Sequence, residues 1–180
     1  DINQGWDLKK ANFYIKKISK YPIFWIEEPI SARSSEKEYL NLIKNSKVNL
    51  ALGENVYNEN LITNFLKNKY LKFFQPDITK YGGITLVNKY INSKYKNKIY
   101  LHFLGSGVGL ITSAHMMSAI NSNGLLETDF NENPLRGSIF NETIKITNGK
   151  IYLNNNPGIG FNLNKKIIKK YTINKFVYKI

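Results

Sequence analysis

Six titratable residues recur along the chain at nearly equal intervals, and their types suit acid–base or metal chemistry. They are Asp1, Glu27, Glu54, Asp77, His102 and Glu127, separated by 26, 27, 23, 25 and 25 residues. Each one after Asp1 closes a short apolar run, and a turn and an amphipathic stretch follow the first five. A strand, its covering helix and two loops need about this many residues, and active sites of parallel barrels lie at the carboxyl ends of the strands. The spacing therefore predicts a repeated strand–helix unit with a titratable group at the end of nearly every strand.

The first three of these residues predict a metal site. Asp1, Glu27 and Glu54 would end consecutive strands, and three carboxylates at one barrel mouth need a cation to remain charged. Oxygen ligands favour Mg²⁺, whereas a chain without Cys, whose second histidine, His115, falls inside a helical stretch, disfavours zinc. The alternative is that each acid caps a helix or pairs with a lysine.

The other three predict proton transfer. A carboxylate at Asp77 beside the imidazole of His102 would fix its tautomer and raise its basicity, which makes His102 a general base. Glu127 is expected to face developing negative charge as a protonated donor, or else to be a plain helix-facing acid. For His115 we expect a structural position without a catalytic role. Together these residues predict abstraction of the proton alpha to a carboxylate, with the metal holding the enediolate that forms.

The elements that would position these residues follow from periodicity and caps. Strands are expected over residues 23–26, 48–52, around 73–74 and over 99–101, with a further one before Glu127. Helices are expected after Asp7, after the capping box of Ser35 and Glu38, around 61–66, after Gly82 and over 110–120. The fold class predicted is α/β, part of a parallel barrel of strand–helix units, over residues 1–129.

Residues 130–180 are expected to form a tail that folds back on the barrel or on a missing domain. Asn148-Gly149 between two short β-prone runs, 143–147 and 150–153, predicts a type I′ hairpin. A basic helix capped by Asn162 is expected to reach residue 171. Earlier in the chain, residues 105–109 (Gly-Ser-Gly-Val-Gly) lie before a helix and could cradle an anion or simply form a turn; they lack the ending of a P-loop.

Composition narrows the class of protein. The 180 residues carry 26 Lys and Arg against 13 Asp and Glu, a net charge of +13, and include no Cys. The lysines are scattered, which favours solvated helix faces over a nucleic-acid surface, although nucleic-acid binding remains an alternative. No apolar run approaches the ~20 residues of a membrane span, and no signal peptide is apparent, so we expect a cytoplasmic protein without a membrane partner. Because the chain begins without Met, on one of the six residues, we expect a fragment of a longer protein.

The motifs resemble the barrel half of the enolase superfamily, in the mandelate racemase and muconate lactonizing enzyme group, which includes many acid-sugar dehydratases. The resemblance runs over nearly the whole chain and weakens after about residue 162. It implies that residues 1–129 are the carboxyl-terminal part of a (β/α)8 TIM-type barrel with about five strands, and that the tail returns toward a missing capping domain. The matching stretches are residues 1–6, 25–29, 51–55, 75–83, 101–103, 126–127, 133–136 and 157–161.

This resemblance implies roles for individual residues. Asp1, Glu27 and Glu54 would bind Mg²⁺, and Asp77 with His102 would be the base dyad. Two further roles follow in the same way. Glu127 would be the electrophilic acid, and Asn3 would touch substrate.

The resemblance implies a small-molecule partner, a sugar acid, and no nucleic acid. Dehydration of an aldonate or aldarate to a 2-keto-3-deoxy acid is the expected reaction, and racemisation or epimerisation of a 2-hydroxy acid is the alternative. A full member of the family also has an amino-terminal capping domain and a further base, often in a Lys-x-Lys motif, which this chain lacks. We therefore expect this 180-residue piece to be inactive alone. We also expect the full-length protein to be a homo-oligomer.

Overall fold

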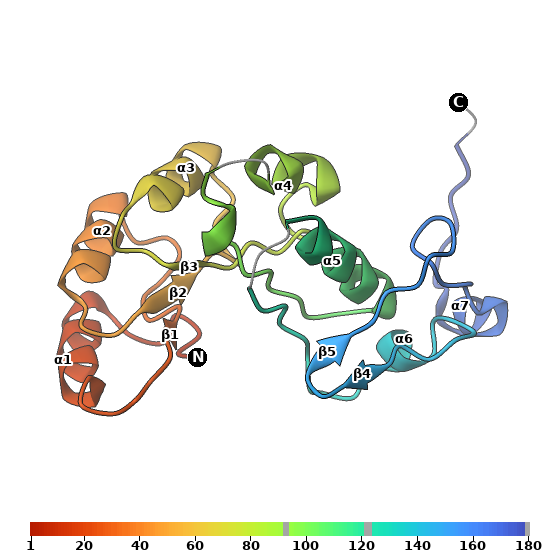
Figure 1. The fold of residues 1–180 in the computed structure, drawn as a ribbon, viewed down its shortest axis with the longest axis horizontal. Helices are drawn as coiled ribbons and strands as arrows, with labels where there is room; N and C mark the ends of the chain where they lie inside the picture. The colour runs from red at the N-terminus through yellow and green to blue at the C-terminus, as the bar shows by residue number, and fades with distance from the viewer. Residues whose placement is uncertain (92–93, 121–123, 179–180) are drawn as a thin grey trace.

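Helices and strands alternate through the first two thirds of the chain, as expected of an α/β protein. The computed structural model describes residues 1–91, 94–120 and 124–178. The first elements are α1 (Leu8–Ile18), β1 (Ile26–Glu27), α2 (Glu36–Asn45), β2 (Leu50–Leu52), α3 (Glu59–Lys67), β3 (Phe73–Phe74), α4 (Gly83–Ile91), a 3-10 turn (Lys96–Lys98) and α5 (Gly107–Ile120). The later elements are α6 (Pro134–Gly137), β4 (Ile146–Thr147), β5 (Lys150–Ile151) and α7 (Lys165–Tyr171). Figure 1 shows α1, α2 and α3 in an arc outside the first three strands.

Six segments of the chain lie side by side in sequence order. Strands β1, β2 and β3 pair in parallel, with Glu27 opposite Ala51. At one edge the amide of Ile2 donates to the carbonyl of Glu27 at 3.0 Å, and at the other Phe74 bridges in parallel to residue 99. The amide of Glu127 in turn donates to the carbonyl of residue 101 at 3.0 Å. This order brings the six titratable residues to one end of the sheet.

The parallel ladders are shorter than the apolar runs suggest. Strand β1 begins at Ile26 and not at residue 23, because the amide of Ile23 closes a turn onto the carbonyl of Tyr21 at 2.8 Å. The expected strand over 99–101 is a single bridge, and the one before Glu127 is a single hydrogen bond. The incomplete barrel is therefore built from three regular strands and from extended segments that flank them.

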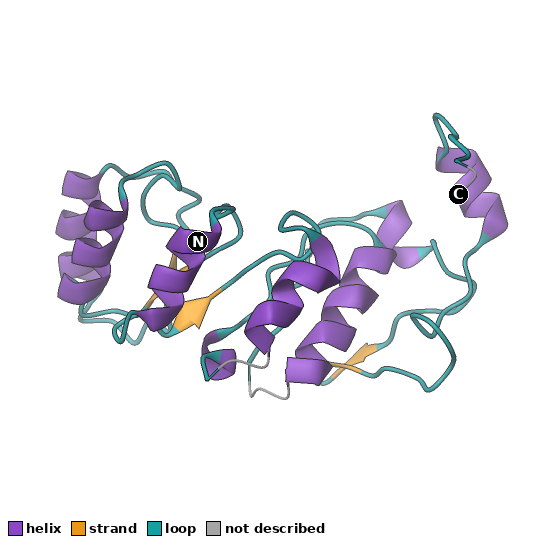
Figure 2. Cartoon of the chain, turned by 90° about the horizontal axis from the view of Figure 1, so that it is seen from above, coloured by secondary structure: helices purple, strands orange, loops and turns teal. Residues whose placement is uncertain are grey.

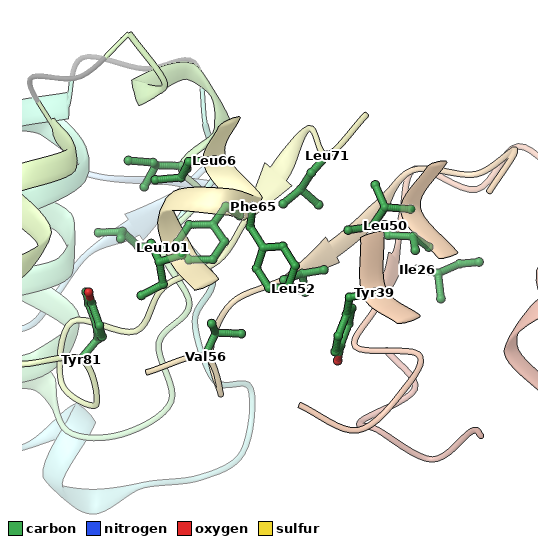
Figure 3. Close-up of a cluster of buried hydrophobic side chains, with 14 of the residues drawn as sticks. Ile26, Tyr39, Leu50, Leu52, Val56, Phe65, Leu66, Leu71, Tyr81 and Leu101 are labelled. Atoms are coloured by element: carbon green, nitrogen blue, oxygen red, sulfur yellow. The ribbon is translucent and has the colours of Figure 1, made fainter. Parts of the chain in front are cut away.

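Alternate residues of the strands pack under the helices. Ile26, Leu50 and Leu52 belong to one buried cluster with Tyr39 of α2 and Phe65 of α3 (Figure 3). Because successive side chains of a strand point to opposite faces, this cluster fixes the outer face of the sheet. The Tyr39 hydroxyl also donates to the carbonyl of residue 30 at 2.6 Å, so the buried polar group is satisfied.

Four rings line the other face of the sheet, which we call the aromatic ladder: Phe24, Trp25, Phe73 and Tyr100. Trp25 lies 5.0 Å from Phe73 and 5.9 Å from Tyr100 between ring centroids, and Phe73 lies 4.9 Å from Tyr100. Phe24 joins from the side at 5.2 Å from Phe73 and is 62% exposed. Trp25 and Tyr100 each stand two residues before a titratable residue, so the ladder forms the floor beneath those groups.

Helix ends follow the sequence closely, with two corrections. Asp7 caps α1, and Ser35 with Glu38 forms a complete capping box on α2, both as predicted. The basic helix α7 is capped by Asn164, so the expected cap at Asn162 is wrong. The amide and side chain of Asn162 instead donate to the Glu142 carboxylate at 3.0 and 2.7 Å. Helix α5 begins at residue 107, three residues before the predicted start.

The carboxyl-terminal part packs on α5 through a second, smaller core. Ile111 of α5 is fully buried against Ile139 and Phe140, and partly buried residues between 135 and 168 cover this cluster. Strands β4 and β5 form the predicted hairpin, with Asn148 and Gly149 both at positive φ, as a type I′ turn requires. Figure 2 shows this part beside α5, with α7 at the far end. Across the described residues, no helix is both long and apolar enough to cross a membrane.

Candidate active site

The strand ends come unusually close together where β2 passes β3. Gly53 has a φ of +148°, and a Cβ there would lie 2.7 Å from the amide nitrogen of Gln75. Only glycine permits this approach of two backbones. Consequently Glu54, the next residue, lies beside the turn that carries Asp77.

Asp77 and His102 form a hydrogen-bonded dyad, and its role as a base stays a prediction. The Nδ1 atom of His102 lies 2.9 Å from Oδ2 of Asp77, and both side chains are buried. The amide and hydroxyl of Thr79 donate to the other carboxylate oxygen, Oδ1, at 2.7 and 2.6 Å. Burial alone would raise the pKa of Asp77, but the hydrogen bonds from His102 and Thr79 bring it below its usual range. The carboxylate is therefore charged and fixed on both oxygens.

The other imidazole nitrogen faces Glu54. Nε2 of His102 lies 2.8 Å from Oε2 of Glu54, and Nζ of Lys80 lies 2.6 Å from the same oxygen. The remaining oxygen, Oε1, accepts a hydrogen bond from Nδ2 of Asn55 at 3.0 Å. The hydrogen bond from His102 holds the pKa of Glu54 down at about 2, and Lys80 adds to this effect against the opposing influence of burial. Both oxygens of Glu54 are thus engaged.

These contacts determine the protonation of His102. A ring nitrogen facing an ionised carboxylate must carry a proton to bond to it, so both nitrogens are protonated and the ring is a cation. Burial by itself lowers the pKa of His102, but the hydrogen bonds to Asp77 and Glu54 outweigh it and raise the pKa to about 9. To act as a base from this arrangement, His102 must first give up the proton on Nε2.

Glu127 lies near the same ring nitrogen of His102 that faces Glu54. Its Oε2 is 4.0 Å from Nε2 of His102 and is buried without a hydrogen bond among the described residues. Burial raises the pKa of Glu127, and the charge of Glu27 raises it further. These influences favour the protonated form that a hydrogen-bond donor to developing negative charge requires.

The predicted metal ligands have oxygen donors of the kind Mg²⁺ prefers, but they are not gathered around one point. Glu27 is buried at the end of β1, whereas Asp1 is exposed and accepts a hydrogen bond from the amide of Asn3 at 2.6 Å. Within the described ranges, no three His, Asp or Glu side chains are arranged to hold a metal ion. The donor types therefore fit Mg²⁺, while Glu54 is turned toward Lys80 and His102.

A further buried carboxylate, Glu28, is repelled by the acids beside it, as is expected where several carboxylates would share a cation. Glu28 is 1% exposed, and its Oε1 has no hydrogen bond within the described part of the chain. Burial raises its pKa, and the charges of Glu54 and Glu27 act in the same direction, although Asn55 donates to its Oε2 at 2.8 Å. These acids lie close enough to repel one another, and their negative charges are only partly balanced by Lys80.

Three residues of this network had no role assigned from sequence: Lys80, Asn55 and Thr79. Thr79 could have been found, because an acid followed two residues later by Thr is a common side-chain-to-backbone turn. Lys80 lies in the same turn as Asp77, but its contact with Glu54 depends on how two strands meet. Asn3, the predicted substrate contact, is exposed near Asp1, and His115 is half-buried with Nε2 at 3.2 Å from the carbonyl of residue 159.

The glycine-rich loop has a packing explanation. A Cβ at Gly109 would lie 2.3 Å from the ring of Phe103, and one at Gly107 would lie 2.8 Å from the carbonyl of Arg136. These glycines let the start of α5 approach its neighbours. Anion binding by this loop stays a prediction.

Comparison with known proteins places this arrangement in context. The family model described as "Enolase C-terminal domain-like" matches residues 1–167. The arabinonate dehydratase of Saccharolobus solfataricus is 27% identical over 95% of this chain and 46% of its own length. The L-talarate/galactarate dehydratase of Salmonella typhimurium is 28% identical over 92% of this chain and 40% of its own.

Solved structures show the same similarity. A mandelate racemase/muconate lactonizing enzyme from Bordetella bronchiseptica superposes with a TM-score of 0.81 at 30% identity, over 93% of this chain and 48% of that one. The chain thus spans about half the length of the relatives that it matches.

Proposed function

Because the chain belongs to the enolase C-terminal domain-like family, we propose that the whole protein dehydrates a sugar acid, an aldonate or aldarate, to a 2-keto-3-deoxy acid with the help of Mg²⁺. The observation that carries this proposal is the placement of His102 between two carboxylates at the end of the strands. Two relatives named as sugar-acid dehydratases support the substrate class.

His102 is the proposed base. Once Nε2 is deprotonated, it accepts the proton alpha to the substrate carboxylate, and Asp77 stabilises the imidazolium through Nδ1. The proton then held on Nε2 is available to the departing β-hydroxyl, so that water leaves and the resulting enol becomes the ketone. Glu127, protonated, donates a hydrogen bond to the oxygen on which negative charge develops.

Glu27 and Glu54, with Asp1, are the residues proposed to hold Mg²⁺. When bound, the ion would neutralise charge on the substrate carboxylate and on the enediolate formed from it, as in other enzymes of this superfamily. The carboxylates' own part is to stay in place. Asn55 serves it by donating a hydrogen bond to Oε1 of Glu54 at 3.0 Å.

The test uses the full-length protein with a panel of aldonates and aldarates and excess Mg²⁺, and it measures 2-keto acid formation. We expect His102→Gln to lower the rate by roughly 10²–10⁴-fold, the usual contribution of a general base. His115→Gln is the matched control and should keep the wild-type rate, since His115 lies in α5 away from the dyad. Wild-type turnover that survives His102→Gln would refute the assignment.

Racemisation of a 2-hydroxy acid is a second candidate reaction, because the similar structure from Bordetella bronchiseptica is named a mandelate racemase/muconate lactonizing enzyme. On the same residues, return of a proton to the carbanion would racemise a 2-hydroxy acid without loss of hydroxyl. Reaction in deuterated water distinguishes the two. Racemisation places deuterium on the alpha carbon of recovered substrate without any keto product, and dehydration gives the keto product.

A further inference from the structure

Lys80 makes the tightest lysine–carboxylate contact among the described residues. Its Nζ lies 2.6 Å from Oε2 of Glu54, with the lysine side chain 36% exposed and the carboxylate 15% exposed. By comparison, Lys89 and Glu59 lie 3.2 Å apart with both side chains more than half exposed. The partly buried pair is less screened by water and therefore interacts more strongly.

The positive charge of Lys80 also acts on other carboxylates near Glu54. It lowers the pKa of Glu28 and of Glu127, and so partly offsets the repulsion from neighbouring acids that raises the pKa of each. Lys80 thus lies against one of the proposed metal ligands, Glu54. Its Nζ contacts Oε2 of Glu54, the oxygen that also faces Nε2 of His102.

We propose that Lys80 is an internal counter-ion that occupies Glu54 in the metal-free protein and competes with the divalent cation for it. This inference rests on the proposed function, because it assumes that Glu54 is a metal ligand. Lys80 holds the carboxylate ionised and in place, and it leaves Oε2 when the cation binds.

Lys80 is the partner of Glu54 that is free to leave. His102 is 2% exposed and is held at its other nitrogen by Asp77, so its ring has no alternative position without breaking that contact. The lysine has a long, flexible side chain, one third exposed, that can swing to solvent. Departure of Lys80 removes one of the two partners of Oε2 of Glu54 and leaves the contact between His102 and Asp77 undisturbed.

The experiment measures Mg²⁺ and Mn²⁺ affinity of the purified full-length protein by titration calorimetry, without substrate. Lys80→Met removes the competitor and should tighten binding by roughly tenfold or more, as expected of a close, partly buried charge pair. Lys89→Met removes the same charge from an exposed pair and should leave the affinity within about twofold of wild type. Lys80→Arg, which keeps the charge, should also stay near wild type.

Three outcomes would count against the inference. Equal or weaker metal binding by Lys80→Met than by wild type overturns it alone and leaves the proposed function standing. Tightening by Lys80→Arg as large as that by Lys80→Met overturns the counter-ion role, since the charge was kept. Absence of metal binding by every variant at millimolar concentration overturns both this inference and the metal's part in the proposed function.

Discussion

The charged contacts of His102 predict a stability that falls as the solution becomes alkaline. In the folded protein the pKa of His102 is raised from its ordinary 6.5 to about 9. A group that binds its proton more tightly when folded stabilises the fold fully below its unfolded pKa and loses that effect as the pH passes its folded pKa. The contribution is therefore complete below pH 6.5 and disappears as the pH rises through about 9.

The magnitude follows from the shift. A rise of the His102 pKa from 6.5 to about 9, at about 1.36 kcal/mol for each tenfold change in proton affinity, corresponds to roughly 3 kcal/mol of unfolding free energy. The lowered pKa of Glu54, about 2, expresses the same contact from the acid side, so the two are not added. That contribution is present above the ordinary carboxylate pKa of 4.5 and is lost as the pH falls through about 2. The contact should be at full strength between about pH 4.5 and 6.5.

Urea unfolding in EDTA at pH 6, 7, 8, 9 and 10 measures the effect, with wild type and His102→Gln compared at each pH. The comparison removes the titration of lysines and tyrosines common to both proteins. We expect the stability advantage of wild type over the variant to shrink by roughly 3 kcal/mol between pH 6 and pH 10. A difference that stays constant over this range would refute the assignment of a doubly bonded imidazolium.

Two further substitutions test the framework around the site. Gly53→Ala should destabilise by about 1–3 kcal/mol in urea unfolding, because the new Cβ meets the backbone of Gln75 at 2.7 Å, while Gly137→Ala meets nothing within 4 Å and should stay near wild type. Ser35→Ala removes the hydroxyl that accepts from the amide of Glu38 and should cost about 1 kcal/mol. These predictions would be contradicted if Gly137→Ala lowered the free energy of unfolding as much as Gly53→Ala, or if Ser35→Ala did not lower it.

Local signals carried most of what the sequence could predict. The cap at Asp7, the capping box at Ser35 and the turn at Asn148-Gly149 depend on residues a few positions apart, and all three are found. The contact of His102 with Asp77 was also predictable, because parallel strands in sequence order place their ends together. Strand length was not, since pairing depends on how far neighbouring segments remain aligned.

The charge state of the site lay beyond the sequence. Predicting His102 as a cation requires knowing that Glu54 faces its second nitrogen, and this depends on the close passage of two strands at Gly53. The choice between Asn162 and Asn164 as the cap of α7 was likewise decided by a distant partner, the carboxylate of Glu142. Where several residues could make a local contact, tertiary packing decided which one did.

The aromatic ladder gives the sheet an optical signature of its own. Trp25, Phe73 and Tyr100 come from three different segments and contact one another at 4.9–5.9 Å, so their fixed packing should contribute to the near-ultraviolet circular dichroism, together with Trp6 stacked on Tyr14. Helices that lie outside the sheet govern the far-ultraviolet signal instead. During unfolding, near-ultraviolet loss ahead of far-ultraviolet loss would mean that the strands separate while the helices persist, as in a molten globule. The two wavelength ranges can thus follow aromatic packing, including that of the floor of the site, and the helices separately in one sample.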